Sequence, residues 1–199
     1  MLKDFPKEVA LKTGDAVILR PIVKEDEQKL LDFFKRLPEK DRLYLKHDVT
    51  DPAVIHGWSE NINYEHVTPI IAEKGDLIIG DATLHHRTTD GPLVVGEIRI
   101  VTDKDYRRIG LGTRLAREIY FLALSRKMNQ LVAEVVEDQE HVIKAFTRLG
   151  FRLDKVLKDK AVDLHGKKHN LVIMTANVDD LWTTIEEQIG KDVGRGSRT

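Results

Sequence analysis

The chain has 199 residues, with 32 basic and 33 acidic side chains and a net charge of −1. Because 41% of it is hydrophobic and disorder requires low hydrophobicity with high net charge, we expect a folded, compact protein. The absence of cysteine excludes disulfides, thiolate metal sites and a cysteine nucleophile. The chain begins without the apolar run of a signal peptide and contains no apolar stretch of membrane-spanning length, so we expect a cytoplasmic protein that does not bind a membrane.

The first part of the chain predicts one strand and three helical segments. Residues 16–22 are apolar and β-branched, and we expect this strand at a sheet edge because Pro21 lies near its end. Apolar residues recur at spacings of three and four over 24–37, which predicts an amphipathic helix. Two short helical pieces are expected at 41–46 and 53–60.

The middle of the chain predicts an antiparallel meander. Strands at 67–73 and 77–86 are joined by a short turn and should form a hairpin. A second turn at 89–91 leads into a third strand at 93–102.

After the meander the apolar period changes to that of a helix. The pattern predicts a long helix at 109–127, a strand at 132–136, a helix at 139–149 and a strand at 171–178. This order is typical of a mixed α/β sheet with one parallel pairing near its centre.

We expect one domain over 1–178, followed by a short C-terminal helix and polar tail over 179–199. The tail carries apolar residues at the spacing of an amphipathic helix, including Leu181, Trp182 and Ile185. Trp182 is interpreted as an anchor that docks this helix.

The loop that precedes the long helix carries the strongest functional signal. Gly110 and Gly112 allow backbone N–H groups at the helix start to converge on an anion, which the helix dipole also favours. Residues 99–127 contain eight basic and three acidic side chains, a net charge of +5. We therefore expect this loop to bind a phosphate group. Neither the dinucleotide fingerprint nor the P-loop fits it, because Leu115 and Arg114 stand where those motifs require glycine and Ser/Thr.

The pattern Arg107-x-x-Gly110-x-Gly112 resembles the pyrophosphate-binding motif of the GNAT N-acetyltransferases. The order of predicted elements over about residues 15–178 matches the same family, as does the segment Ala145–Phe151. The resemblance implies an α/β (α+β) fold with a mixed, mostly antiparallel central sheet of six to seven strands. Helices would cover both faces, and a splayed parallel pair would form the acyl-CoA site.

A closer resemblance is to the acetyltransferase domain of bacterial protein lysine acetyltransferases, on the segments 37–45, 62–66 and 96–101. The resemblance implies acetyl-CoA as cosubstrate and no metal. It also implies an oxyanion donor among the backbone N–H groups near Ile100 or Val101. The residues implied to bind acetyl-CoA are Ile100, Val101, Thr102, Arg107, Arg108, Ile109, Gly110, Leu111, Gly112, Thr113 and Gln139.

Two glutamates are candidate general bases. Glu97 stands at the base position of the lysine acetyltransferases, and Glu134 at that of the ribosomal-protein N-terminal acetyltransferases. The alternative for Glu97 is a solvated strand residue, paired for example with Arg99, and Glu134 can equally be structural. Many family members have a tyrosine as general acid where this chain has Phe146, which cannot donate a proton.

These features predict an N-acetyltransferase that moves the acetyl group directly to a primary amine, of a protein lysine or a small molecule, in a ternary complex. The alternative is a non-catalytic acyl-CoA sensor or partner-binding module. Nucleic-acid binding is disfavoured because the local positive charge suits one coenzyme. A homodimer is possible, since family members often form dimers. The histidine pairs His85/His86 and His165/His169 are interpreted as surface residues rather than metal ligands.

Overall fold

The structure is a computed structural model that describes residues 2–87 and 93–195. The turn expected at 89–91 and the end of the polar tail, 196–199, lie outside the described residues. Within those ranges no helix is long and apolar enough to cross a membrane.

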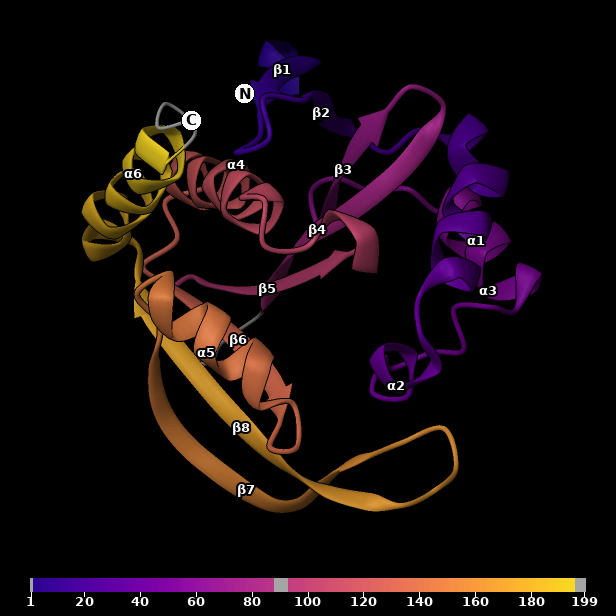
Figure 1. The fold of residues 1–199 in the computed structure, drawn as a ribbon. Helices are drawn as coiled ribbons and strands as arrows, with labels where there is room; N and C mark the ends of the chain where they lie inside the picture. Colours follow the sequence, from indigo (N-terminus) through magenta and orange to yellow (C-terminus); the bar gives the residue numbers. More distant parts are fainter. Residues whose placement is uncertain (1, 88–92, 196–199) are drawn as a thin grey trace.

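Eight strands form a single open sheet in the order β1-β2-β3-β4-β5-β6-β8-β7 (Figure 1). All neighbouring strands are antiparallel except β5 and β6, which are parallel. The strands are β1 (Lys7–Ala10), β2 (Ala16–Pro21), β3 (Val67–Lys74), β4 (Leu77–Arg87), β5 (Val95–Thr102), β6 (Gln130–Val136), β7 (Arg152–Val162) and β8 (Lys168–Asn177).

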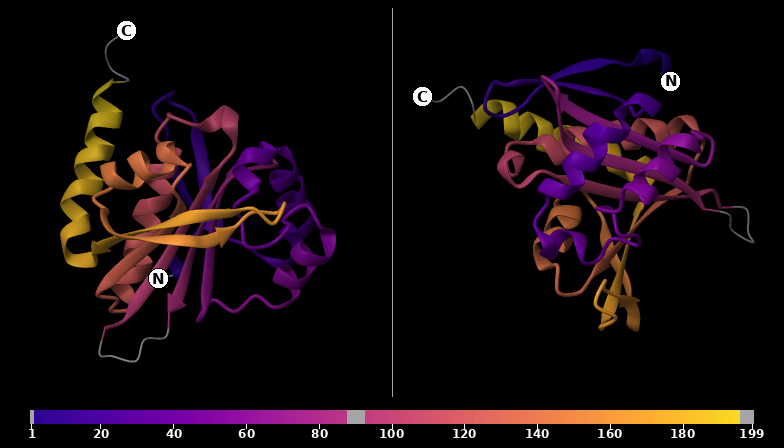
Figure 2. Two further views of the ribbon diagram at one scale, coloured as in Figure 1. Left: turned by 90° about the horizontal axis from the view of Figure 1, so that it is seen from below. Right: turned by 90° about the vertical axis from the view of Figure 1, so that its right-hand side faces the viewer.

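Helices cover both faces of the sheet (Figures 1 and 2). The α-helices are α1 (Glu27–Arg36), α2 (Glu39–Arg42), α3 (Pro52–Glu60), α4 (Leu111–Ser125), α5 (Glu140–Arg148) and α6 (Val178–Arg195). Single 3-10 turns lie at Leu2–Asp4, Lys24–Asp26 and Lys104–Tyr106.

Two apolar cores lie on opposite faces of the sheet. The larger joins the sheet to α4, α5 and α6 through fully buried side chains such as Leu115 and Ile119. The smaller lies beneath α1 and α3 and includes Phe33 and Ile55. The helices thus bury their apolar stripes as their spacing predicts. The apolar residues of the C-terminal segment lie on α6, where Trp182 stacks on Tyr120 of α4 with ring centroids 5.6 Å apart.

The expected fold class is confirmed, but the sheet has eight strands rather than six to seven. Sequence reasoning missed β7, because an edge strand exposed on both faces carries charged residues instead of an apolar pattern. It also missed the four-residue strand β1. Since β1 pairs with β2, the expectation that residues 16–22 form an edge strand is wrong.

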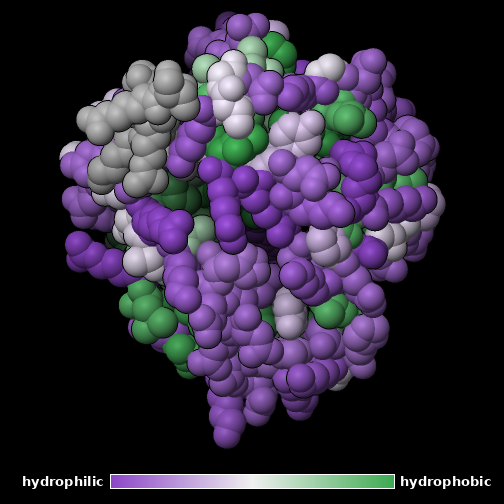
Figure 3. Space-filling model, viewed as in Figure 1, coloured by the Kyte–Doolittle hydropathy of each residue, from purple (hydrophilic) through white to green (hydrophobic). Residues whose placement is uncertain are grey.

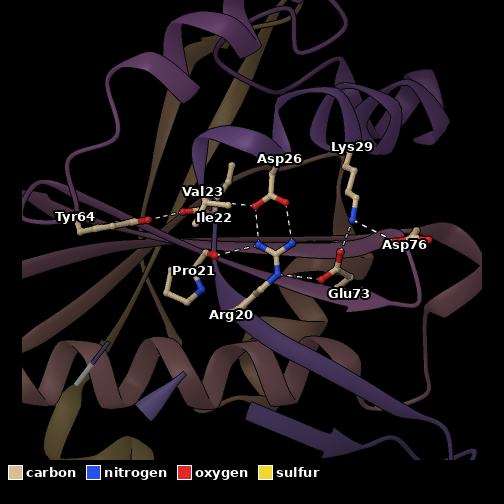
Figure 4. A network of polar contacts seen from close by, with 9 residues as sticks. All are labelled: Arg20, Pro21, Ile22, Val23, Asp26, Lys29, Tyr64, Glu73 and Asp76. Atoms are coloured by element: carbon tan, nitrogen blue, oxygen red, sulfur yellow. Dashed lines mark hydrogen bonds and ion pairs between the residues drawn. The ribbon is translucent and has the colours of Figure 1, made fainter. Parts of the chain in front are cut away.

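A charged network fixes α1 against the sheet (Figure 4). Arg20 of β2 donates from both Nη atoms to the carboxylate of Asp26, at 2.6 and 2.7 Å, and from Nε to Glu73 of β3 at 2.9 Å. Lys29 of α1 donates to the same Glu73 at 2.8 Å. Burial opposes ionisation of Asp26, but Arg20 outweighs it and lowers the pKa of this carboxyl group. The network therefore fixes the start of α1 against β2 and β3.

The parallel pair β5–β6 separates almost as soon as it forms. Its register covers only Val95–Glu97 against Gln130–Val132. Beyond this point β5 continues to pair with β4 alone, and β6 with β8 alone (Figure 1). The edge of β5 over 98–102 therefore faces a gap in the hydrogen-bond ladder, and the expected splayed parallel pair is confirmed.

Gly96 lies where these two strands are still paired, and its missing side chain permits the close packing there. A Cβ at this position would lie 2.7 Å from Leu84 Cδ1, 2.7 Å from Met128 Sδ and 2.8 Å from Leu131 Cδ2. A larger residue would have to push the strands and the end of α4 apart just before the divergence.

We expect Gly96→Ala to lower the free energy of unfolding by about 1–3 kcal/mol, because the added methyl overpacks this contact. Gly57→Ala in α3 is the matched control, since no atom lies within 4 Å of its new Cβ. The control should leave stability unchanged or raise it by roughly 0.5–1 kcal/mol. Denaturant unfolding of both variants checks this, and equal stability of Gly96→Ala and the parent would contradict the packing argument.

Candidate functional site

The start of α4 presents free backbone donors. Gly110 caps the helix in the left-handed region, with φ of +88°. The first intrahelical bond runs from Arg114 N to Gly110 O at 3.0 Å, so the N–H groups of Leu111, Gly112 and Thr113 precede the helical ladder. These three donors and the positive end of the helix dipole are the features by which a helix start can bind an anion, as the sequence predicts for this loop.

Gly112 keeps this helix start accessible. A Cβ built on Gly112 meets no atom within 4 Å, and the residue has no strained φ. The free edge of β5, on which the predicted residues Ile100, Val101 and Thr102 lie, leads into the loop that ends at this helix. A strand edge with unpaired N–H and C=O groups thus lies just before a helix start with free N–H groups. This arrangement fits an elongated ligand that carries a polyphosphate at one end.

Two of the predicted arginines of this loop differ in their surroundings. Arg107 donates from Nη2 to Asp41 of α2 at 2.8 Å and to the carbonyl of Thr102 at 3.3 Å, so it connects the loop to α2. Arg108 has a φ of +64° and is exposed. The backbone carbonyl of Ile109 accepts from Lys12 N at 3.0 Å, which fixes the loop to the segment after β1.

Two further residues named in the sequence analysis belong to α5: Gln139 lies at its start and Phe146 on its buried side. Gln139 is the N-cap residue of α5, and its carbonyl accepts from Val142 N at 2.8 Å. Phe146 is 6% exposed and packs against Phe151 with ring centroids 5.0 Å apart. Phe146 is therefore part of the apolar core.

The two candidate glutamates meet in one cluster of charges on the face of the sheet opposite α4. Arg87 of β4 donates from Nε and Nη2 to Glu97 Oε2, at 2.9 and 2.8 Å, and its Nη2 also donates to Glu134 Oε1. Arg99 donates from Nε and Nη2 to Glu97 Oε1, at 2.8 and 2.7 Å. The Nζ of Lys46 lies 3.5 Å from Glu97 and 3.4 Å from Glu134.

These contacts decide the protonation of Glu97. Burial alone would raise its pKa, since the residue is only 4% exposed. The charges and hydrogen bonds of Arg99 and Arg87, with Lys46 nearby, outweigh burial and lower the pKa to about 2. The interpretation of Glu97 as a solvated strand residue is therefore wrong, whereas its pairing with Arg99 is present.

Sequence reasoning missed part of this cluster. Arg87 and Lys46 were not singled out, and His85 was interpreted as a surface residue. A signal existed in β4, where Asp81, Thr83, His85 and Arg87 stand at alternate positions and share one face. Lys46 carried no such signal, because it lies in the irregular segment after α2.

Two titratable groups of β4 are shifted in opposite senses. Burial, assisted by the charge of Arg99, lowers the pKa of His85 to about 4, so this imidazole is neutral at pH 7. Burial raises the pKa of Asp81 to about 7, against the hydrogen bond from Thr83 and the charge of Arg99. Burial thus disfavours the charged form of both groups.

His169 is also not a surface histidine. It is 8% exposed, and its ring nitrogens contact two different carboxylates, Asp138 at 3.0 Å and Asp163 at 2.9 Å. The tip of the β7–β8 hairpin also meets the segment after α2, where Leu164 N donates to the carbonyl of Leu43 at 3.2 Å. These contacts hold the hairpin against the segment that carries Lys46.

Comparison with known proteins identifies this architecture. The model of the acetyltransferase (GNAT) family matches residues 28–151. The structure is similar to the GNAT domain of S. lividans PAT, with a TM-score of 0.73 and 17% identity over 86% of this chain and 96% of that one. It is also similar to Mycobacterium smegmatis RimJ in complex with CoA-disulfide, with a TM-score of 0.74 and 17% identity over 96% and 94% of the two chains.

A third similar structure is yncA from Salmonella typhimurium, a putative acetyltransferase with its cofactor acetyl-CoA. Its TM-score is 0.68, with 18% identity over 82% of this chain and 95% of that one. At these identities the structures show a shared fold, and the family model, which spans more than half of the chain, shows the family. The chain therefore belongs to the acetyltransferase (GNAT) family, whose members transfer acetyl groups from acetyl-CoA.

Proposed function

We propose that this protein transfers the acetyl group of acetyl-CoA directly to a primary amine within a ternary complex. The observation that carries the proposal is that three features adjoin one another. They are the free edge of β5, the unpaired N–H groups at the start of α4, and the pair Glu97 and Glu134 beside the divergence of β5 and β6. The acceptor would be a small-molecule amine or a protein lysine.

The two ends of acetyl-CoA would bind by different physical means. The pyrophosphate would accept hydrogen bonds from the N–H groups of Leu111, Gly112 and Thr113. The pantetheine chain would extend along the edge of β5 over 98–102, as an additional strand would. This arrangement directs the thioester toward Glu97, and a backbone N–H near Ile100 or Val101 would stabilise the oxyanion.

In the transfer step the acceptor nitrogen attacks the thioester carbonyl carbon, the C–N bond forms and the C–S bond breaks. The proton lost by nitrogen would pass to Glu97, directly or through water, and the electron pair of the C–S bond leaves on sulfur. Phe146 cannot protonate the thiolate, because a phenyl side chain has no acidic proton to donate. A thiol is acidic enough for the thiolate to leave without an acid and take a proton from water.

The low pKa of Glu97 restricts the form in which the amine can react. A carboxylate with a pKa of about 2 is too weak a base to deprotonate a free ammonium group. It can take a proton from the tetrahedral intermediate, in which the nitrogen is far more acidic. The acceptor must therefore reach the thioester as the neutral amine, and Glu134, which shares Arg87 with Glu97, is the alternative base.

We expect Gly112→Val to weaken acetyl-CoA binding at least tenfold, because it adds a bulky side chain at the helix start whose N–H groups are assigned to the pyrophosphate. The folded protein should tolerate the change, since nothing lies within 4 Å of the new Cβ. Calorimetric titration with acetyl-CoA measures the effect. Gly190→Val in α6 adds the same side chain at another open glycine and should bind like the parent. Unchanged affinity in Gly112→Val would contradict the assigned phosphate site.

We expect Glu97→Gln to lower kcat by about 10²-fold or more, because the amide cannot accept the proton. The KM for acetyl-CoA should change less than about twofold, since Glu97 is not assigned to coenzyme binding. Glu134→Gln should have a smaller effect, and Glu140→Gln on the exposed side of α5 controls for the loss of one charge. A larger loss in Glu134→Gln than in Glu97→Gln would assign the base to Glu134.

The dependence of the rate on pH tests the same assignment. Because Glu97 stays ionised down to a pH of about 2, the rate between pH 5 and 8 should rise only with deprotonation of the acceptor amine. A carboxylate limb between pH 4 and 7 that disappears in Glu97→Gln would show that its pKa is not lowered, and would contradict this account.

A further inference from the structure

We infer that the amine acceptor carries an anionic group, a carboxylate or a phosphate, and that Arg87, Arg99 and Lys46 bind it. The inference rests on the proposed acetyl transfer and specifies its acceptor. The three cations come from separate parts of the chain: β4, β5 and the segment between α2 and α3.

The carboxylates of this cluster lie beneath the cations. The side chain of Glu97 is 6% exposed and that of Glu134 is 19% exposed. The side chains of Arg87, Arg99 and Lys46 are 35%, 33% and 53% exposed. An acceptor that approaches from solvent therefore meets positive groups before it reaches Glu97. On the side of the molecule seen in Figure 1, the surface is mainly hydrophilic and is hollowed near its middle, where some hydrophobic side chains are visible (Figure 3).

The charges in the cluster do not cancel. Three cations surround two carboxylates, and His85, which faces Glu97 across the β4–β5 pair, is neutral at pH 7. Asp81 lies two positions before Thr83 on the same strand, and burial disfavours its ionised form. Three cations against two carboxylates give the described cluster a net charge of +1.

The arginines retain donors that suit an anion. Their contacts to Glu97 and Glu134 use Nε and Nη2, and the Nη1 groups make no hydrogen bond to another residue within 2–87 and 93–195. A guanidinium group binds carboxylate or phosphate through paired N–H groups, and such charge-assisted bonds are stronger than neutral ones. A second cationic group on the acceptor would instead be repelled by three cations.

The surroundings favour a small acceptor. The hairpin tip contacts the segment that carries Lys46, through Leu164 and Leu43 and through Tyr44 packed edge-on against His169. A small apolar cluster, formed by Val95, Val132 and Ile173, lies on the same face beside the carboxylates. We therefore favour a short amino acid or aminoalkyl phosphate over an acidic peptide.

Matched pairs of amines test the inference. Release of free CoA from acetyl-CoA is measured with 4-aminobutyrate against butylamine, and with 2-aminoethyl phosphate against ethanolamine. We expect the anionic member of at least one pair to have a kcat/KM at least tenfold higher, and the better pair identifies carboxylate or phosphate. Equal rates within both pairs, or faster transfer to the neutral amines or to an acidic lysine peptide, would overturn the inference while leaving acetyl transfer intact.

The variant Lys46→Gln provides a second test of the inferred anion site. This side chain is the most exposed of the three cations, and its loss leaves both arginines on Glu97. We expect the preference for the anionic amine to fall about three- to tenfold, with the KM for acetyl-CoA unchanged. Lys144→Gln, which removes one charge from the exposed surface of α5, should behave like the parent. An equal preference in Lys46→Gln and Lys144→Gln would remove Lys46 from the site.

A binding measurement separates this inference from the proposed function. If no amine releases CoA, calorimetric titration with 2-aminoethyl phosphate and with 4-aminobutyrate still tests the anion site. Binding that weakens in Lys46→Gln but not in Lys144→Gln would support the site and reject acetyl transfer. Absence of binding to both probes would overturn the inference.

Discussion

The separation of β5 from β6 after three residue pairs is the constraint on which the rest of the structure depends. A continuous parallel ladder would satisfy the backbone of β5 and leave no edge for a ligand. The separation instead exposes the edge over 98–102 and directs it toward the three unpaired N–H groups of α4. The close packing of Gly96 on Leu84, Met128 and Leu131 holds the strands together up to that point. One backbone feature thus underlies both halves of the proposed coenzyme site.

Three of the eight basic side chains in the segment 99–127 form ion pairs within the described residues. Within the segment of net charge +5, Arg99 binds Glu97 and Arg107 binds Asp41. Arg117 binds Glu186 of α6. Each partner except Glu97 is more than 60 residues away. These three arginines bind carboxylates of β5, α2 and α6, whereas the proposed phosphate site consists of the backbone N–H groups of 111–113. Under this proposal a nearly neutral chain binds a polyphosphate through backbone groups.

Much of the fold could be predicted from the sequence, because most strands and helices bury one face and therefore show an apolar period. β7 could not, since it is exposed along almost its whole length. The glycine loop was also predictable, because its chemistry depends on residue type at fixed spacing. Arg87 and Lys46 were not, since their roles arise only when β4 pairs with β5 and the segment after α2 folds over them. The low pKa of Glu97 follows from the same long-range contacts.

Hydrogen exchange with and without acetyl-CoA tests the central claim most directly, because it reports on the backbone groups that the claim assigns. Acetyl-CoA should slow exchange in peptides that cover 98–102 of β5 and 111–113 of α4. Exchange in β1 and in the β7 edge strand should not change. Protection that is absent from 98–102 and 111–113, or that is confined to other elements, would contradict a coenzyme site at the separation of β5 and β6.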